Sequence, residues 1–208
     1  MKTAIFGKVL VSFLLLIVAG CASAHVPIPV DLASSIPGTT VTVRGEPHKL
    51  IGTPLQVGGP LPITALTDAF SMKKVDLTDL NGKILLISLV PSIDTKVCEA
   101  QTHYLGEQGA KLPPVVQRIT ISRDTPFAQK RFAEEAKLTG ITFLSDYRDG
   151  SFGKATGLLV EDSMLLARSV ILVDGNGIVR YIQVVPDLTH LPDLESAFAK
   201  AEALAGKK

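Results

Sequence analysis

The chain has 208 residues, of which 46% are hydrophobic and 20% are charged, and its formal net charge is +1. This length and apolar content suit one domain with a sizeable core plus a processed leader. The near-neutral, interspersed charge argues against a nucleic-acid partner, because such proteins carry a clustered basic face.

The first residues have the pattern of an export signal. Lys2 and Lys8 supply a positive start, and residues 9–19 form an apolar stretch broken only by Ser12. A membrane-spanning helix needs roughly 20 apolar residues, so this stretch is too short to cross a bilayer. It fits the hydrophobic region of a signal peptide, and we predict that residues 1–20 are one.

The end of this segment, Val18-Ala19-Gly20-Cys21, resembles a bacterial lipobox, in which the cysteine is diacylated and becomes the mature N-terminus. An ordinary secretory cleavage site is the alternative, since residues 22–24 have the small-x-small pattern. Both interpretations export the protein. We favour a lipoprotein held to a bacterial membrane through Cys21, facing the periplasm or the cell exterior.

Residues 21–40 are predicted to be a tether, because 25–40 are rich in Pro, Ser and Val and show little periodicity. The folded domain is expected over 41–208. It begins with a β-hairpin signal, in which 41–44 and 48–51 flank Gly45-Glu46-Pro47.

The apolar run 84–90 predicts a buried strand. The residues after it predict a helix that has Cys98 in its first turn, Leu105 and Leu112 as apolar positions, and Pro113-Pro114 as its end. A short strand near 75–77 and a turn at 80–82 precede this unit.

Strands and helices alternate along the rest of the chain. We predict strands at 115–122 and 141–144, a helix from Pro126, a helical turn at 151–155, a hairpin of 169–173 and 178–184, and a final helix at 192–204. This order predicts an α/β fold of thioredoxin-like type, a central sheet flanked by helices with an N-terminal β-hairpin.

Cys98 is the most informative residue of the chain. At the first turn of a helix, free backbone N–H groups and the helix dipole favour a thiolate over a thiol. The only other cysteine is Cys21, so the mature domain has one free thiol, which excludes a structural disulfide and a CxxC exchanger. The alternative is an inert, buried cysteine.

The stretch 91–98, with Pro91, Thr95 and Cys98, resembles the peroxidatic motif of peroxiredoxins, and more closely that of their thiol peroxidase branch. The resemblance runs from about residue 41 to the C-terminus. Further matching blocks lie at 124–132, 144–149, 166–170 and 191–193. It implies reduction of hydrogen peroxide and organic hydroperoxides through a cysteine sulfenate, without a cofactor, by a homodimer.

The resemblance also implies roles for individual residues. Cys98 is the expected nucleophile, and Thr95 is expected to hydrogen-bond both the sulfur and the peroxide. The backbone N–H groups of Val97 and Cys98 are expected to bind peroxide oxygens, and Pro91 to shield the sulfur. Arg168, just before an apolar strand, is the expected active-site cation, because a guanidinium stays charged and presents a planar fork of donors.

Other polar residues receive smaller roles. Gln101 matches the family, but the sequence assigns it no step. Arg123 and Asp124 are expected to form surface pairs. No metal site is predicted, because the histidines are too scattered for convergent ligands.

One departure from the family pattern affects recycling. A resolving cysteine usually follows the arginine-phenylalanine pair, whereas Arg131-Phe132 is followed here by Ala133. The resemblance therefore predicts a one-cysteine peroxidase whose sulfenate is reduced by an external thiol, a thioredoxin-like protein or a small molecule. The alternative function is a non-catalytic thioredoxin-fold protein that senses peroxide or binds a partner through oxidised Cys98.

Overall fold

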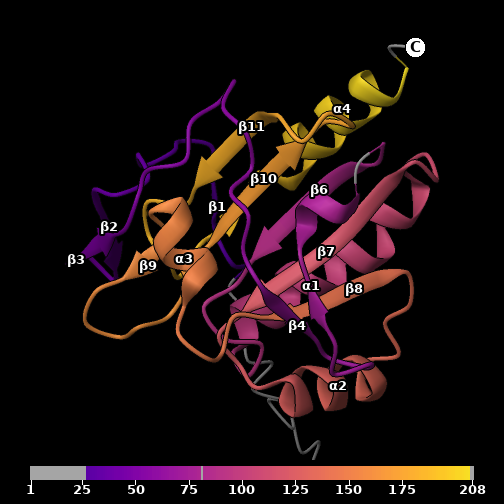
Figure 1. Cartoon of the computed structure of the whole chain (residues 1–208). Coiled ribbons are helices and arrows are strands. Elements are labelled where there is room, and N and C mark those ends of the chain that lie inside the picture. Colours follow the sequence, from indigo (N-terminus) through magenta and orange to yellow (C-terminus); the bar gives the residue numbers. More distant parts are fainter. Residues whose placement is uncertain (1–26, 81, 207–208) are drawn as a thin grey trace, which may run out of the picture.

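A computed structural model describes residues 27–80 and 82–206 (Figure 1). The predicted signal peptide and Cys21 lie outside these residues. Within the described part, no helix has both the length and the apolar character needed to cross a membrane.

A seven-stranded mixed sheet forms the centre of the domain, with strand order β11-β10-β6-β7-β8-β4-β5 (Figure 1). Its strands are β4 Leu66–Asp68, β5 Lys74–Val75, β6 Ile84–Leu89, β7 Val116–Ser122, β8 Ile141–Ser145, β10 Ser169–Val173 and β11 Val179–Val184. Strands β6, β7 and β8 are parallel, and β10 pairs antiparallel with β6. All six residues of β6 are buried, as expected for a strand covered on both faces.

Helices α1 (Lys96–Glu107) and α4 (Leu194–Ala205) cover one face of the sheet, where Leu86 and Leu172 pack against Leu105 and Phe198. On the same strands, alternate residues such as Ile87 and Ile171 point into the larger core on the other face. That face is covered by α3 (Ser151–Thr156) and by a small sheet of β2 (Thr40–Val43), β3 (Glu46–Ile51) and β9 (Leu159–Val160). Helix α2 (Pro126–Glu135) packs against β8 (Figure 1).

The predicted hairpin is present, but its turn lies earlier than expected. Arg44 and Gly45 both have positive φ values, 54° and 86°, which is the conformation of a two-residue hairpin turn. Glu46 and Pro47 therefore belong to strand β3 and pair with Val43 and Thr42. The turn forms at the glycine because it tolerates left-handed backbone without strain.

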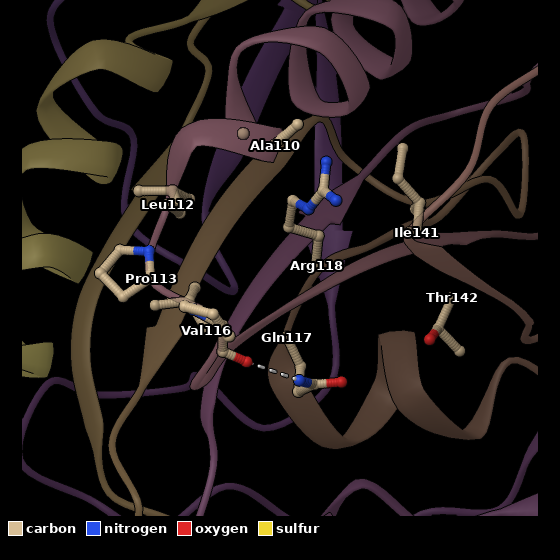
Figure 2. A pocket seen from close by; sticks show the side chains of 11 residues that line it. Ala110, Leu112, Pro113, Val116, Gln117, Arg118, Ile141 and Thr142 are labelled. Carbon is tan, nitrogen blue, oxygen red and sulfur yellow. Dashed lines mark hydrogen bonds between the residues drawn. The ribbon is translucent and has the colours of Figure 1, made fainter.

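Helix α1 also ends earlier than predicted, at Glu107 instead of just before Pro113. Glycines at 106 and 109 disfavour continuation, and residues Gly109–Lys111 form a 3₁₀ turn instead. Arg118 Nη1 donates to the carbonyl oxygens of Leu105 at 3.3 Å and Gly106 at 2.7 Å, which satisfies the end of the helix. Figure 2 shows the Arg118 side chain extending from its strand into the pocket lined by the segment after the helix.

Part of the predicted tether packs on the domain. Strand β1 (Val30–Asp31) pairs in parallel with β12 (Leu191–Pro192). Ser35 forms a bridge with Val184 at the edge of the central sheet. The described part of this segment therefore covers the free edge of β11.

Asp187 fastens the hairpin to the loop that follows β11. Its carboxylate accepts hydrogen bonds from Thr42 Oγ1 (3.3 Å), the Arg44 and Gly45 amides (3.4 and 3.3 Å), and the Thr189 amide and hydroxyl (2.9 and 2.7 Å). Burial raises the pKa of this carboxyl, but the bonds from Thr189, Arg44 and Gly45 together outweigh it and lower the pKa to about 2.

This carboxylate makes the stability depend on pH on the acid side. The unfolded carboxyl has a pKa of about 3.9, so the stabilisation is present above about pH 5 and is lost as the pH falls toward 2. We expect Asp187→Asn to lower the free energy of unfolding by roughly 1 kcal/mol at pH 7, after allowing for solvent screening. Urea unfolding should show that the difference in free energy of unfolding between the unaltered protein and Asp187→Asn is smaller at pH 2.5 than at pH 7. An equal difference in free energy of unfolding at both pH values would contradict this account.

Candidate active site

The candidate site lies at the carboxyl edge of the parallel strands, where ligands commonly bind in open α/β sheets. The loop 91–95 leaves the end of β6 and leads directly into α1. Because β10 runs antiparallel to β6 and pairs Ser169 with Leu89, Arg168 arrives at the same edge. Sheet register thus brings two segments 70 residues apart together.

Cys98 occupies the third position of α1, which confirms the predicted place in the first helical turn. Thr95 is the N-cap residue, with extended backbone and no side-chain bond to the helix. The Cys98 side chain is fully buried against Val90 and Ile93, with Phe132 packing onto this cluster. The thiol therefore has mainly apolar neighbours.

A buried arginine contacts the sulfur. Arg168 is only 2% exposed, and its Nη2 donates to Cys98 Sγ at 3.3 Å. Its Nη1 donates to Gln101 Oε1 at 2.6 Å and its Nε to the Leu188 carbonyl at 3.0 Å. Burial lowers the pKa of the Arg168 guanidinium, whereas the adjacent Cys98 sulfur favours the charged form. An inert cysteine in a purely apolar core would have no such partner.

Gln101, to which the sequence assigned no step, holds the arginine in place. It lies one helical turn after Cys98 on the same face of α1. Its amide nitrogen donates to Ser88 Oγ at 2.7 Å and to the Leu89 carbonyl at 3.3 Å. These bonds fix its amide oxygen toward Arg168. The i+3 spacing from Cys98 is the only local signal that could have indicated this role.

Asp124 corrects a sequence-based expectation. Instead of forming a surface pair, its carboxylate accepts from Ser92 Oγ and from the Ile93 amide, both at 2.8 Å. The reason is the parallel pairing of β7 with β6, which brings the residue after β7 beside the loop after β6. Asp124 thus holds the loop 91–95 that leads into α1.

Thr95 lies differently from the prediction. Its hydroxyl donates to the Ser92 carbonyl at 3.4 Å, and its side chain is exposed. Among the described residues, the only hydrogen bond to Cys98 Sγ comes from Arg168. The hydroxyl closes the turn that leads into α1 and leaves the first turn of the helix without a side-chain cap.

An open cavity of about 920 Å³ gives access to the site. Pro91, Thr95, Val97 and Arg168 are among the residues that line it. The hairpin, the segment after β9 and the loop after β11 supply its walls, which are mainly apolar: Val43, Val160, Leu165 and Leu188. At its rim, His48 Nδ1 lies 2.6 Å from Asp162 Oδ2. The described residues contain no group of His, Cys, Asp and Glu able to hold a metal ion.

Comparison with known proteins identifies the family. A family model described as Redoxin matches residues 56–199. The thiol peroxidases of Halalkalibacterium halodurans and Bacillus subtilis are 44% and 42% identical over 165 residues, covering 79% of this chain and 98% and 97% of theirs. The chain belongs to the peroxiredoxin family. Its activity is the thiol-dependent reduction of peroxides, and the non-catalytic alternative is not favoured.

Solved structures of peroxiredoxins agree with the fold. A peroxiredoxin-like protein from Aquifex aeolicus superposes with a TM-score of 0.76 at 31% identity, covering 83% of this chain and 99% of that one. A thiol peroxidase from Chromobacterium violaceum, 23% identical, shares the fold with a TM-score of 0.67 and coverage of 79% and 97%. The thioredoxin-like fold predicted from the sequence is therefore confirmed.

In this peroxiredoxin, Ala133 and Cys98 belong to different apolar clusters. Ala133 is 2% exposed and packs with Ala69 and Phe143 beneath α2. Its neighbour Phe132 packs onto the Cys98 cluster. Cys98 is the free cysteine of the described residues, so the position where a resolving thiol was expected is occupied by apolar packing.

Proposed function

We propose that Cys98 is the peroxidatic nucleophile and that Arg168 holds both its sulfur and the peroxide. The observation that supports this is the 3.3 Å bond from the buried guanidinium to Cys98 Sγ. In the reaction the thiolate attacks one peroxide oxygen, the O–O bond breaks, and the second oxygen leaves as hydroxide or alkoxide and takes a proton. Cys98 becomes a sulfenic acid.

Some N–H groups of the Arg168 guanidinium remain available to bind the peroxide. A guanidinium carries five N–H groups, and three of them bind Cys98, Gln101 and Leu188. One N–H on each terminal nitrogen remains for peroxide oxygens. A fixed cation at this point stabilises the negative charge as it moves from sulfur to the leaving oxygen.

Backbone donors at the start of α1 complete the proposed site. The Val97 and Cys98 amides precede the first intrahelical bond and have no acceptor among the described residues. Val97 lines the cavity together with Pro91 and Thr95. Pro91 limits water near the sulfur, and the Thr95 hydroxyl reaches the peroxide after a change of its side-chain rotamer. The apolar cavity walls suit organic hydroperoxides as well as hydrogen peroxide.

The arginine can be tested by substitution. We expect Arg168→Lys to slow oxidation of Cys98 by hydrogen peroxide at least a hundredfold, since an ammonium lacks the planar fork and each tenfold is about 1.4 kcal/mol. Gln101→Leu should cause a smaller loss, because it frees Nη1 but leaves the charge. Quenched-flow oxidation with intact-mass detection measures both rates. An unchanged rate in Arg168→Lys would remove Arg168 from the mechanism.

We further propose recycling by an external thiol, because no second cysteine remains in the folded domain. The thiol condenses with the sulfenic acid to a mixed disulfide with loss of water, and a second thiol releases Cys98. One equivalent of peroxide should therefore give a mass gain of one oxygen, trappable by a dione reagent. Without thiol, further peroxide should produce the sulfinic acid.

The matched control is Ala133→Cys, which returns a thiol to the position where the family resemblance expects one. This variant should lose the trappable sulfenic acid and form an intramolecular disulfide with Cys98 instead. For the unaltered chain, a rapid and complete Cys98–Cys98 linkage between two subunits would contradict the one-cysteine route. The homodimer implied by the resemblance stays a prediction.

We also propose that the protein is exported and anchored through a diacylated Cys21. Eight residues separate Cys21 from Val30, and an extended chain spans at most about 3.6 Å per residue, so the domain would stay within roughly 30 Å of the membrane. Mass spectrometry of the mature N-terminus should find diacylglycerol on Cys21. A free N-terminus at His25 would contradict the lipoprotein while leaving export in place.

A further inference from the structure

Residues 30–35, here called the strap, are fastened to the domain by a series of polar contacts. Gln183 Nε2 donates to the Asp31 and Ala33 carbonyls at 2.6 and 3.0 Å. The Val184 amide donates to Ser34 Oγ at 3.0 Å, and the Ser35 amide donates to the Val184 carbonyl at 2.8 Å. The strap lies outside residues 56–199, which match the family.

The side chain of Asp31 reaches from the strap to the loop formed by residues 186–190, here called the Leu188 loop. Its Oδ2 accepts a hydrogen bond from the Asp187 amide at 3.4 Å and lies 3.1 Å from His190 Nδ1. One carboxylate oxygen thus contacts the loop on both sides of Leu188. Asp31 and His190 are both only partly exposed, so these contacts are less screened than those of a surface pair.

The Leu188 loop in turn holds the active-site arginine. The Leu188 carbonyl accepts from Arg168 Nε at 3.0 Å, and the Val185 amide just before the loop donates to the Arg168 carbonyl at 2.9 Å. Leu188 itself is 8% exposed and lines the cavity. Two short links, Asp31 to the loop and the loop to Arg168, therefore connect the strap with the guanidinium that contacts Cys98.

We propose that Asp31 is a positioning residue for the peroxidase reaction, acting through the Leu188 loop on Arg168. A buried guanidinium needs an acceptor in a fixed place for each donor, and Nε has only the Leu188 carbonyl among the described residues. The hairpin holds the same loop from its other side, because the Leu188 amide donates to the Thr42 carbonyl at 2.8 Å. When Asp31 is lost, the contact on the strap side is missing, and the Leu188 carbonyl shifts enough to turn the guanidinium away from Cys98. The segment that links the domain to its N-terminus is thereby part of the active-site support. This inference rests on the proposed role of Arg168.

The test is a double-mutant cycle in the full-length protein. We expect Asp31→Ala to slow Cys98 oxidation by hydrogen peroxide about tenfold, within the usual range for residues coupled through a shared network. In an Arg168→Gln background the same change should have less than a twofold effect, because the group it positions is gone. Asp31→Asn, which keeps an acceptor for the Asp187 amide, should recover part of the rate.

Asp174→Ala is the matched control for lost stability. This carboxylate also fastens a loop, accepting from the Asn176 and Ile178 amides and from Arg180 Nε, but in the hairpin turn at the opposite end of β10 from Arg168. It should lower Tm without changing the rate. The proposal is overturned if Asp31→Ala leaves the rate unchanged, or slows it equally with and without Arg168. If wild-type Cys98 does not react with peroxide at all, the proposed function itself fails.

Discussion

The burial of one positive charge constrains this structure more than any other feature. Arg168 is 2% exposed, and an unpaired buried charge would cost several kcal/mol. Its three acceptors come from two parts of the chain, Cys98 and Gln101 on α1 and the Leu188 carbonyl after β11. Correct assembly of the sheet edge is therefore required to satisfy the guanidinium, and the same assembly builds the site.

Because the guanidinium needs acceptors in fixed places, further residues hold the groups that contact it. Ser88 and the Leu89 carbonyl orient Gln101, and Asp124 holds the loop before α1. At the far end of α1, Arg118 satisfies the last carbonyls. The loop before α1 and the C-terminal turn of α1 are thus each held by a side chain, which positions the helix beside Arg168.

Ala133 stands where the family resemblance leads us to expect a resolving cysteine, and this changes what the proposed reaction requires after the first step. Cys98 is fully buried among apolar side chains, so in the proposed one-cysteine route an external thiol has to approach through the cavity or wait for the start of α1 to open. Local opening of this kind is cheapest where few contacts hold a segment. The first turn of α1 has no side-chain cap, which makes it the weakest part of an otherwise well-held helix.

Features that depend on residues close together in the chain could be predicted from the sequence. The apolar run of β6, the start of α2 at Pro126 and the Asp174–Gly177 turn follow from local periodicity, proline geometry and turn chemistry. The position of Cys98 in the first turn of α1 followed from the same local rules, and the motif around it indicated the family.

The pairing of polar groups, in contrast, depends on how distant parts of the chain pack together. Gln101 and Arg168 are 67 residues apart, and Asp31 and Asp187 are 156 apart, so no local pattern pairs them. Asp124 is a charged residue of a type that usually lies on the surface. It supports the site because β7 pairs with β6, which brings Asp124 beside the loop that leads into α1. Hydrophobic periodicity specifies which face of an element is buried, whereas strand order and register specify its neighbours. Those are set only when the whole chain packs.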